Sequence, residues 1–527
     1  MATTLHSKRG EAASPAPPHP RASQLLLETL RGLKQYGGLI GRLNSNDRVS
    51  PLGLPRAARL PVLSALQSDL DRPAVLITQR ADLAFALHDE LGFWSTSPRL
   101  HLREPNPLFY EQADWGVGTR RDRLKALTTL AAYHFPGSPA VHKHPIIVAS
   151  ARAVMTKTVP LDRFLAACYG LTIGMSLAPE SLRHTLVDLG FERTNTVLEP
   201  GQFSSRGGIV DLWPPAEDAP IRLDFFGDEL DGIRRFDPAS QRSIEDLQWI
   251  LVAPAREYVP AQAARGAVWP GAYPRPGDSE ITTVSEFEIP LLYPNAGTLL
   301  DYVPSPTLAF TDDLSEIEAV VDEVEGQAMQ SRETAVKDGV LPPDFPVPYV
   351  TWSEIQDQLQ TMAAVELARE SEPGGPAIEQ AGTFGDVFRH DERFGGRLKP
   401  FMDYVGQLAG QGHVVIIASR QRARLAELWK QRREQANEAG PRERAPARDL
   451  VEHVHFLEAT LAEGFVLDTS HLITDSEIFG WQRPAPRARR RPGAETPETV
   501  YADLRPDDFV VHVDHGIGRY LGLVTRN

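Results

Sequence analysis

The sequence contains one cysteine, Cys168, among 527 residues. A single cysteine excludes an internal disulfide and a zinc site made of several thiolates from one chain. No glycine is followed directly by lysine, so the phosphate-binding loop G-x-x-x-x-G-K-[ST] is missing. Apolar runs are short, and none reaches the 18 residues that a membrane-spanning helix needs. These absences argue against a disulfide scaffold, a P-loop ATPase and a membrane protein.

Positive charge is in the minority, with 55 basic residues against 70 acidic ones and a net charge of −15. This balance excludes a uniformly basic surface for nucleic acid and leaves only a local patch. The length predicts three or four domains at about 150 residues each. Residues 1–22 are rich in proline, alanine and serine and lack the apolar core of a signal peptide. We therefore expect a disordered tail followed by a cytoplasmic multidomain protein that contacts no membrane.

The first block, residues 23–155, has the pattern of an α/β domain. Residues 73–78 and 145–149 are short apolar runs of the kind that form buried strands. Between them, residues 80–94 carry leucine at every fourth position, which is typical of a helix. A strand, a helix and a second strand in this order predict parallel pairing.

The second block, residues 156–249, is α+β in character. A helix is predicted over 179–189, and short β runs follow it. The glycine and aspartate at 227–228 separate the last two runs and predict a hairpin turn. The predicted strands cover 208–213, 220–226 and 230–236.

The rest of the chain alternates between weak and clear patterns. An acidic helix is predicted over 312–332, with a solvated face. A small α/β domain is predicted over 344–481, where a strand at 413–418 lies between helices at 398–408 and 420–435.

A low-complexity stretch, residues 482–500, reads as a basic linker. Residues 501–527 then begin a β pattern that is too short to bury a core of its own. We therefore expect the chain to end inside a domain.

The residues alone reveal no active site. The acidic stretch 228–231 falls on the predicted hairpin turn, where a structural role is expected before a magnesium site. Cys168 lies in an apolar helical stretch, as expected of a core thiol and not of a nucleophile. Two histidine pairs lack a third metal ligand and are expected on exposed strands: His142 with His144, and His453 with His455. From residues alone, a scaffold or adaptor is predicted.

Two neighbouring segments carry a more specific signal, RGGIVDLWP at 206–214 and IRLDFFGDELDGIRRFD at 221–237. In order and spacing they resemble the signature of the UvrB-like module, which the excision-repair protein UvrB shares with the transcription-repair coupling factor (Mfd) family. The resemblance implies a RecA-like UvrB-homology domain of residues 23–155 and 250–335. It also implies an inserted α+β UvrA-binding domain of residues 156–249. The stretch matching the phosphate loop of UvrB, about residues 44–63, is degenerate, as in Mfd-type modules.

Two further segments favour the Mfd family over UvrB. Residues 464–480, which end in TDSEIFG, look like the exit of the third domain of this family, where a strand leads into a basic linker. Residues 508–520, DFVVHVDHGIGRY, resemble the start of the RNA-polymerase-interacting domain that Mfd shares with CarD-type regulators and that UvrB lacks. The resemblance thus implies a third domain at 344–481 and the start of a β-barrel-like domain at 501–527.

The resemblance also assigns candidate contacts with UvrA. Arg193 and Arg206 fall at positions where the family places arginines that contact UvrA, whereas Ser204 stands where UvrB has another arginine. An arginine fork matches a partner carboxylate in a way that lysine cannot reproduce. The alternative for Arg206 is that it only bonds the adjacent β turn.

Candidate contacts with RNA polymerase and DNA lie near the C-terminus. The resemblance implies that Val511, His512 and Arg519 contact the polymerase β subunit by strand addition, with His515 equally well explained as a core or turn residue. A basic cluster in the linker could touch DNA phosphates, or it could simply be solvated. The cluster consists of Arg487, Arg489, Arg490 and Arg491.

The function implied by the resemblance is transcription-coupled nucleotide-excision repair. In this family, ATP-dependent release of RNA polymerase stalled at a lesion is coupled to recruitment of UvrA, and the full-length protein acts on double-stranded DNA. ATP and magnesium belong to motor domains of the family that this sequence does not contain, so we expect neither a catalytic residue nor a cofactor here. The alternatives are a stand-alone UvrB-like adaptor for UvrA that has no translocase, and a CarD-like transcription regulator.

Overall fold

The computed structural model describes residues 20–45, 49–135, 138–142, 144–259, 285–368, 383–438, 453–480, 509–512 and 516–519. The chain divides into two compact units, Met1–Trp481 and Gln482–Asn527, which are considered separately below. Of the expected disordered tail 1–22, residues 1–19 lie outside the described residues, and the first helix begins at Pro20. In the described part of the chain, no helix combines the length and apolarity required to cross a membrane.

A five-stranded parallel sheet organises the first part of the chain. Its strand order is β13-β12-β1-β3-β2. Every residue of β1 and β3 is buried, which explains their continuous apolar sequence. The two predicted strands and their parallel pairing are thus confirmed. The strands are β1 (Ala74–Thr78), β2 (Arg99–Leu102), β3 (Ile146–Ser150), β12 (Leu308–Thr311) and β13 (Ala363–Glu366).

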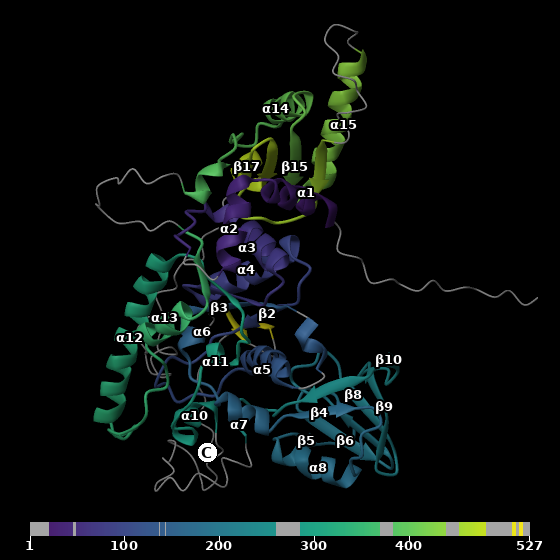
Figure 1. The fold of residues 1–527 in the computed structure, drawn as a ribbon, viewed down its shortest axis with the longest axis vertical. Coiled ribbons are helices and arrows are strands. Elements are labelled where there is room, and N and C mark those ends of the chain that lie inside the picture. The colour runs from purple at the N-terminus through teal and green to yellow at the C-terminus, as the bar shows by residue number, and fades with distance from the viewer. Residues whose placement is uncertain are drawn as a thin grey trace, which may run out of the picture. The chain divides into compact units, whose positions relative to one another are not determined.

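Helices cover both faces of this sheet, and Figure 1 shows α3 and α4 on one side with α5 and α6 on the other. Alternate residues of β1 enter two different cores, with Val75 and Ile77 on the α5 side and Leu76 on the α4 side. The helices of this part are α1 (Pro20–Arg31), α2 (Lys34–Asn44), α3 (Arg56–Leu70), α4 (Ala81–Trp94), α5 (Val117–Ala131), α6 (Ala151–Met155), α7 (Leu161–Ala166), α10 (Ile289–Leu292), α11 (Leu299–Tyr302), α12 (Leu314–Lys337) and α13 (Trp352–Gln360).

A six-stranded sheet with helix α8 (Pro179–Asp188) against one face forms the second module, in the order β10-β9-β8-β7-β6-β5 (Figure 1). Phe203, Val210 and Leu223 pack on Leu182 and Leu186 of α8, and all five are buried. The predicted helix, strands and hairpin turn are confirmed. The strands are β5 (Glu192–Arg193), β6 (Gln202–Arg206), β7 (Ile209–Leu212), β8 (Ile221–Phe226), β9 (Glu229–Phe236) and β10 (Ser243–Leu247).

A two-stranded ribbon joins this module to the first sheet domain. Strand β4 (Tyr169–Thr172) enters the module and β11 (Trp249–Val252) leaves it, and the two pair antiparallel from Tyr169 with Val252 to Thr172 with Trp249. The chain therefore enters and leaves the module at one place, as expected of a domain inserted into a loop of another.

A second five-stranded sheet, of order β14-β17-β18-β15-β16, follows the first. The helix, strand and helix predicted at 398–408, 413–418 and 420–435 are present in it, whereas α13 and β13, which fall within the predicted range 344–481, belong to the first sheet domain. The elements of the second sheet domain are β14 (Phe388–Arg389), α14 (Leu398–Gly410), β15 (Val414–Ala418), α15 (Arg422–Glu438), β16 (Val454–Leu457), β17 (Phe465–Leu467), β18 (Ser470–Thr474) and α16 (Asp475–Phe479).

The TDSEIFG stretch corrects one expectation. Only Thr474 belongs to a strand, and Asp475–Phe479 forms the short helix α16. The Thr474 hydroxyl accepts a hydrogen bond from the amide of Ser476, and the Glu477 carboxylate accepts one from the amide of Thr474. This capping box starts a helix where the resemblance implied a continuing strand.

The two five-stranded sheet domains share one apolar core. Helix α1 packs between them, and the Thr29 hydroxyl lies 3.0 Å from the Ser470 hydroxyl. The rings of Trp94 and Phe465 stack with their centroids 6.4 Å apart. The third domain is thus bound to the first by buried apolar surface and not only by a linker.

In the second unit, β19 (Phe509–His512) and β20 (Gly516–Arg519) form an antiparallel pair. Phe509 is in register with Arg519, and His512 with Gly516. The β pattern predicted to begin within residues 501–527 is confirmed at Phe509–His512. The basic linker lies outside the described residues.

A candidate docking site on the six-stranded sheet

Arg206 ends strand β6 at the tip of a hairpin and is exposed. Its Nη2 donates a hydrogen bond to the carbonyl of Asn195 at 2.7 Å. Gly207 follows with φ +59°, a backbone conformation that favours glycine and lets the chain turn at this point. The local bond to the neighbouring turn therefore exists, and it holds the guanidinium at the surface.

Arg193 lies on the neighbouring edge strand β5 and is also exposed. It is in parallel register with Phe203, whose side chain is in the core. Because side chains alternate along a strand, Arg206 points to the face opposite to that of Phe203. The register thus places the two arginines at one sheet edge but on opposite faces. Neither guanidinium forms an ion pair with a carboxylate in the described part of the chain.

The outer face of the sheet, which points away from α8, carries charges that neutralise one another. Arg222 binds both oxygens of Asp211 across the strand pair, at 2.7 and 2.8 Å. Arg234 binds Asp224 at 2.6 Å. All four residues lie in the two segments that carry the resemblance, and their charged groups bind one another across neighbouring strands. Much of that signature therefore stabilises the sheet itself.

Ser204, which stands where UvrB has an arginine, is only 5% exposed. Its side chain is too deep in the structure to replace the missing arginine. Position 208 on the same hairpin requires glycine for a steric reason, because a Cβ there would lie 2.7 Å from the carbonyl oxygen of Phe225. The two hairpins β6–β7 and β8–β9 approach each other closely at this point.

The carboxyl edge of the first sheet, where open α/β sheets bind nucleotides, is filled by an internal ion pair. Arg59 donates to Asp312 at 2.9 Å, and Thr78 donates to the other Asp312 oxygen at 3.2 Å. Arg59 also pairs with Asp313 at 3.5 Å. These groups satisfy each other at the edge where a triphosphate would need free donors.

The stretch 44–63, which the resemblance matches to the phosphate loop of UvrB, has two backbone amides bonded to other parts of the chain. The amides of Leu52 and Leu54 donate to the carbonyls of Glu366 and Leu367 at 2.9 and 2.8 Å. A phosphate loop needs such amides free to point at the ligand. The sequence could not show this, because the acceptors lie some three hundred residues further along the chain.

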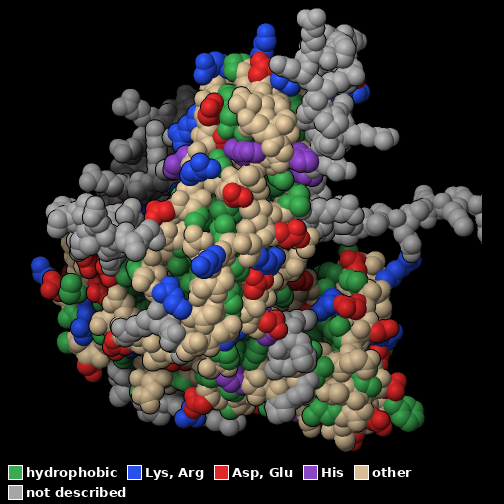
Figure 2. Space-filling model, turned by 45° about the horizontal axis from the view of Figure 1, so that its top comes forward, with side chains coloured by type: hydrophobic (Ala, Val, Ile, Leu, Met, Phe, Trp, Pro, Cys, Tyr) green, Lys and Arg blue, Asp and Glu red, His purple; other side chains and the backbone are tan. Residues whose placement is uncertain are grey.

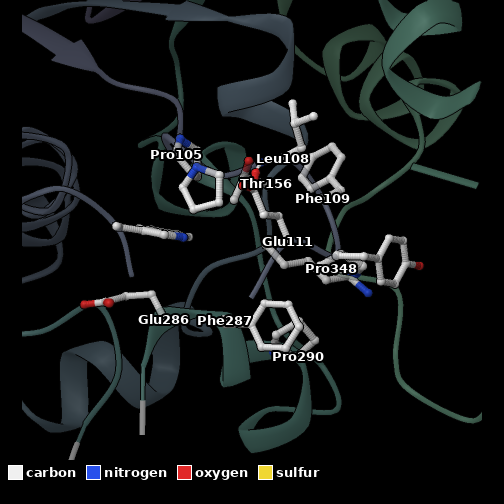
Figure 3. A pocket seen from close by; sticks show the side chains of 13 residues that line it. Pro105, Leu108, Phe109, Glu111, Thr156, Glu286, Phe287, Pro290 and Pro348 are labelled. Atoms are coloured by element: carbon white, nitrogen blue, oxygen red, sulfur yellow. Dashed lines mark hydrogen bonds between the residues drawn. The ribbon is translucent and has the colours of Figure 1, made fainter. Parts of the chain in front are cut away.

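Two hollows elsewhere in the first domain do not suit a nucleotide either. A cavity of about 40 Å³ is lined by prolines and aromatic rings, among them Phe109 and Phe287 (Figure 3), and has room for little more than water. A groove of about 530 Å³ has Asp301, Glu354 and Asp357 in its lining, which would repel phosphates. On the face in Figure 2, acidic and basic side chains are interspersed.

The other residues considered for chemistry have structural explanations. Cys168 is 7% exposed in the main core, where burial raises the pKa of its thiol, so the expectation of a core cysteine is confirmed. The stretch 228–231 forms the β8–β9 turn and the start of β9, as predicted. No group of three metal-ligating side chains occurs among the described residues.

The histidine pairs correct another expectation. His142 lies in a 3-10 helix, and His144 in the loop before β3, so neither is on an exposed strand. The His144 Nε2 lies 3.3 Å from a carboxylate oxygen of Asp71. Of the second pair, His455 is on strand β16 and His453 directly precedes it.

The structure describes only some of the residues predicted to contact RNA polymerase or DNA. Val511 and His512 lie on β19 and Arg519 on β20, in the second unit. His515 and the basic cluster Arg487, Arg489, Arg490 and Arg491 lie outside the described residues.

Comparison with known protein families gives two matches along the chain. Residues 170–258 match the UvrB interaction domain family, and residues 504–527 match the CarD-like/TRCF RID domain family. The first match covers the six-stranded sheet and both strands of the connecting ribbon except Tyr169, at its entry.

Curated relatives extend the similarity along most of the chain. A transcription-repair-coupling factor from Bacillus subtilis (strain 168) is 26% identical over 508 residues, covering 90% of this chain and 42% of its own length. One from Myxococcus xanthus is 27% identical over 557 residues, covering 94% of this chain and 44% of its own. One from Escherichia coli (strain K12) is 25% identical over 491 residues, covering 86% and 40%.

The chain resembles the N-terminal portion of the transcription-repair-coupling factors. It spans about two fifths of the length of the relatives named here.

Proposed function

We propose that this chain is the UvrA-recruiting part of a transcription-coupled nucleotide-excision repair factor that works in the cytoplasm. The observation that carries the proposal is the match of residues 170–258 to the UvrB interaction domain, on a sheet whose edge leaves Arg193 and Arg206 exposed. The names of the relatives, transcription-repair-coupling factors, support the same pathway.

The two arginines are proposed to bind carboxylates of UvrA. Arg206 is already held by the Asn195 carbonyl, so little side-chain entropy is lost when it meets a partner. Arg193 lies at the same edge on the opposite face, so a partner that contacts both must wrap around β5. An arginine in the desolvated centre of an interface contributes about 2 kcal/mol or more.

The remaining functions belong to the same proposal. Residues 501–527, with Val511, His512 and Arg519, would add to a strand of the RNA polymerase β subunit. Arg487, Arg489, Arg490 and Arg491 would contact phosphates of double-stranded DNA. The first sheet domain would have a RecA-like fold that binds no nucleotide. ATP-dependent release of stalled polymerase would then depend on the motor domains of the resembled family, which use ATP and magnesium.

Calorimetric titration of purified UvrA with the 527-residue chain tests the proposal. The double variant Arg193→Ala with Arg206→Ala is expected to keep its circular dichroism spectrum and to lose affinity at least tenfold. Arg163→Ala is the control, because that arginine is exposed on α7, outside the six-stranded sheet. Unchanged affinity of the double variant would refute the arginine contacts, and a wild-type chain that does not bind UvrA would refute the proposed function.

A further inference from the structure

Phe226, at the end of β8, is 83% exposed, more than any other large hydrophobic side chain among the described residues. The preceding Phe225 packs against the core of the module. Because side chains alternate along a strand, Phe226 is turned to the outer face, away from α8. Gly227 then reverses the chain with φ +64°. The ring therefore stands at the tip of a hairpin, in solvent.

The exposed ring is contiguous with the arginine site. The Phe225 amide donates to the Gly208 carbonyl at 2.8 Å, so the β8–β9 tip lies against the β6–β7 tip. Ile209, which is 38% exposed, is in register with Asp224 on one side and with Arg206 on the other. Phe226 is two residues beyond Asp224 and is thus a diagonal neighbour of Ile209. Arg206, Ile209 and Phe226 form one strip on the outer face, named here the tip strip.

The surroundings of the tip strip leave its apolar side chains open to a partner. Two carboxylates lie in register with the strip: that of Asp224, opposite Ile209, is bound by Arg234, and that of Glu229, opposite Phe226, is exposed. A single exposed phenylalanine needs no explanation, but here the ring adjoins a second apolar side chain and an exposed arginine without a carboxylate partner in the described residues. Aromatic rings and arginines together are typical of the central residues of protein interfaces.

We propose that Phe226 is the apolar anchor of the UvrA contact and that it enters an apolar pocket of UvrA whose rim offers a carboxylate to Arg206. This inference rests on the proposed function and extends its site from the β5–β6 edge to the β8–β9 hairpin. Specificity then comes from a ring and a guanidinium at fixed spacing, because both are held by adjacent hairpins of one sheet.

Titration of purified UvrA with variants of the 527-residue chain tests the inference. Phe226→Ala is expected to weaken binding by about tenfold or more, the change that 1.4 kcal/mol produces. Phe226→Tyr keeps an aromatic ring and is expected to retain most of the wild-type affinity. Ile244→Ala is the matched control. Ile244 is 60% exposed, and its strand pairs with the opposite end of β9, next to Phe236. Ile244→Ala should leave affinity unchanged.

The outcomes separate the two proposals. If Arg206→Ala weakens binding and Phe226→Ala does not, the anchor is refuted while the proposed function stands. If Phe226→Ala and Ile244→Ala weaken binding equally, the effect is a general one of the sheet surface, and the anchor is likewise refuted. If the wild-type chain does not bind UvrA, both proposals fall.

Discussion

Arg123 and Glu257 form a doubly hydrogen-bonded ion pair whose side chains are 1% and 0% exposed. The Arg123 Nη2 donates to Oε1 at 2.7 Å and Nε to Oε2 at 2.8 Å. The guanidinium also lies over the ring of Trp115, 4.9 Å from its centroid. Arg123 precedes the inserted module in the chain and Glu257 follows it, so the pair joins the two halves of the first domain.

Breaking this pair is expected to be costly, because the remaining charge would stay buried. Glu257→Ala should lower the free energy of unfolding by about 3–5 kcal/mol. The double replacement Arg123→Met with Glu257→Leu should lose less, because no charge is left without a partner. Urea denaturation of the three proteins measures the difference. An equal or larger loss in the double variant would contradict this view of the pair.

The chain is expected to bind no nucleotide. Its thermal unfolding midpoint should not shift with millimolar ATP and magnesium, whereas a ligand at a hundred times its Kd would add about 2.7 kcal/mol. Arg59→Ala should not create a site, because the amides of Leu52 and Leu54 remain bonded to backbone carbonyls. Leaving Asp312 without its cation should cost about 1–3 kcal/mol of stability. ATP hydrolysis by the purified chain would overturn this prediction.

Replacing each of two glycines by alanine should change the stability of the fold in opposite directions. A Cβ on Gly385 would lie 1.9 Å from the carbonyl oxygen of Gly53, so Gly385→Ala must displace backbone and should cost about 1–3 kcal/mol. Gly37, inside helix α2, has nothing within 4 Å of the added atom. Gly37→Ala should therefore raise stability by about 0.4–1 kcal/mol. Thermal unfolding midpoints of the two variants decide the sign of each effect.

Acid should destabilise the fold through His101. Burial, His88 and Arg103 lower the pKa of His101 from 6.5 to about 4. The unfolded chain therefore takes up a proton that the folded chain refuses, so stability is complete above about pH 6.5 and falls as the pH drops toward 4. The loss is at most about 1.4 kcal/mol per pH unit.

The variant His101→Phe keeps a ring beside Phe85 and His88 but cannot titrate. Its urea midpoint should change less than that of the wild-type protein between pH 6.5 and pH 4. Parallel pH profiles of the two proteins would show that His101 does not contribute. The pKa of His88 is also lowered by burial, so the variant should keep part of the slope.

Arg193 and Arg206 should contribute independently to the affinity for UvrA. Arg193 and Arg206 lie on opposite faces of one sheet edge and share no partner, so the losses of affinity in the two single variants should add in the double variant. Titration of UvrA with all three variants measures the sum. A double variant no weaker than the worse single variant would place both arginines in one coupled contact.

Much of the fold could be predicted from local patterns. Buried apolar runs gave the central strands β1, β3 and β15, because a strand covered on both faces must be apolar throughout. The short edge strands β2 and β5 were not predicted: β5 has only two residues, and both are exposed. Such strands form because of their neighbours and have almost no pattern of their own.

The candidate site could be predicted only in part. The sequence signature identified Arg206, but not that Asp211 and Arg222 bind each other across the sheet. The position of Phe226 had a readable signal, since one of two consecutive phenylalanines in a strand must face outward. The Arg59–Asp312 pair had none, because its partners are 253 positions apart and meet only after the sheet has formed.

The paired strands β4 and β11 have a practical consequence for exchange between proteins. Since Tyr169 and Val252 are cross-strand partners, the segment between them begins and ends at almost the same point in space. Such a segment can be lifted out and replaced by a short link, or grafted into a foreign loop, without stretching either host. The six-stranded module can therefore be exchanged between proteins as a unit.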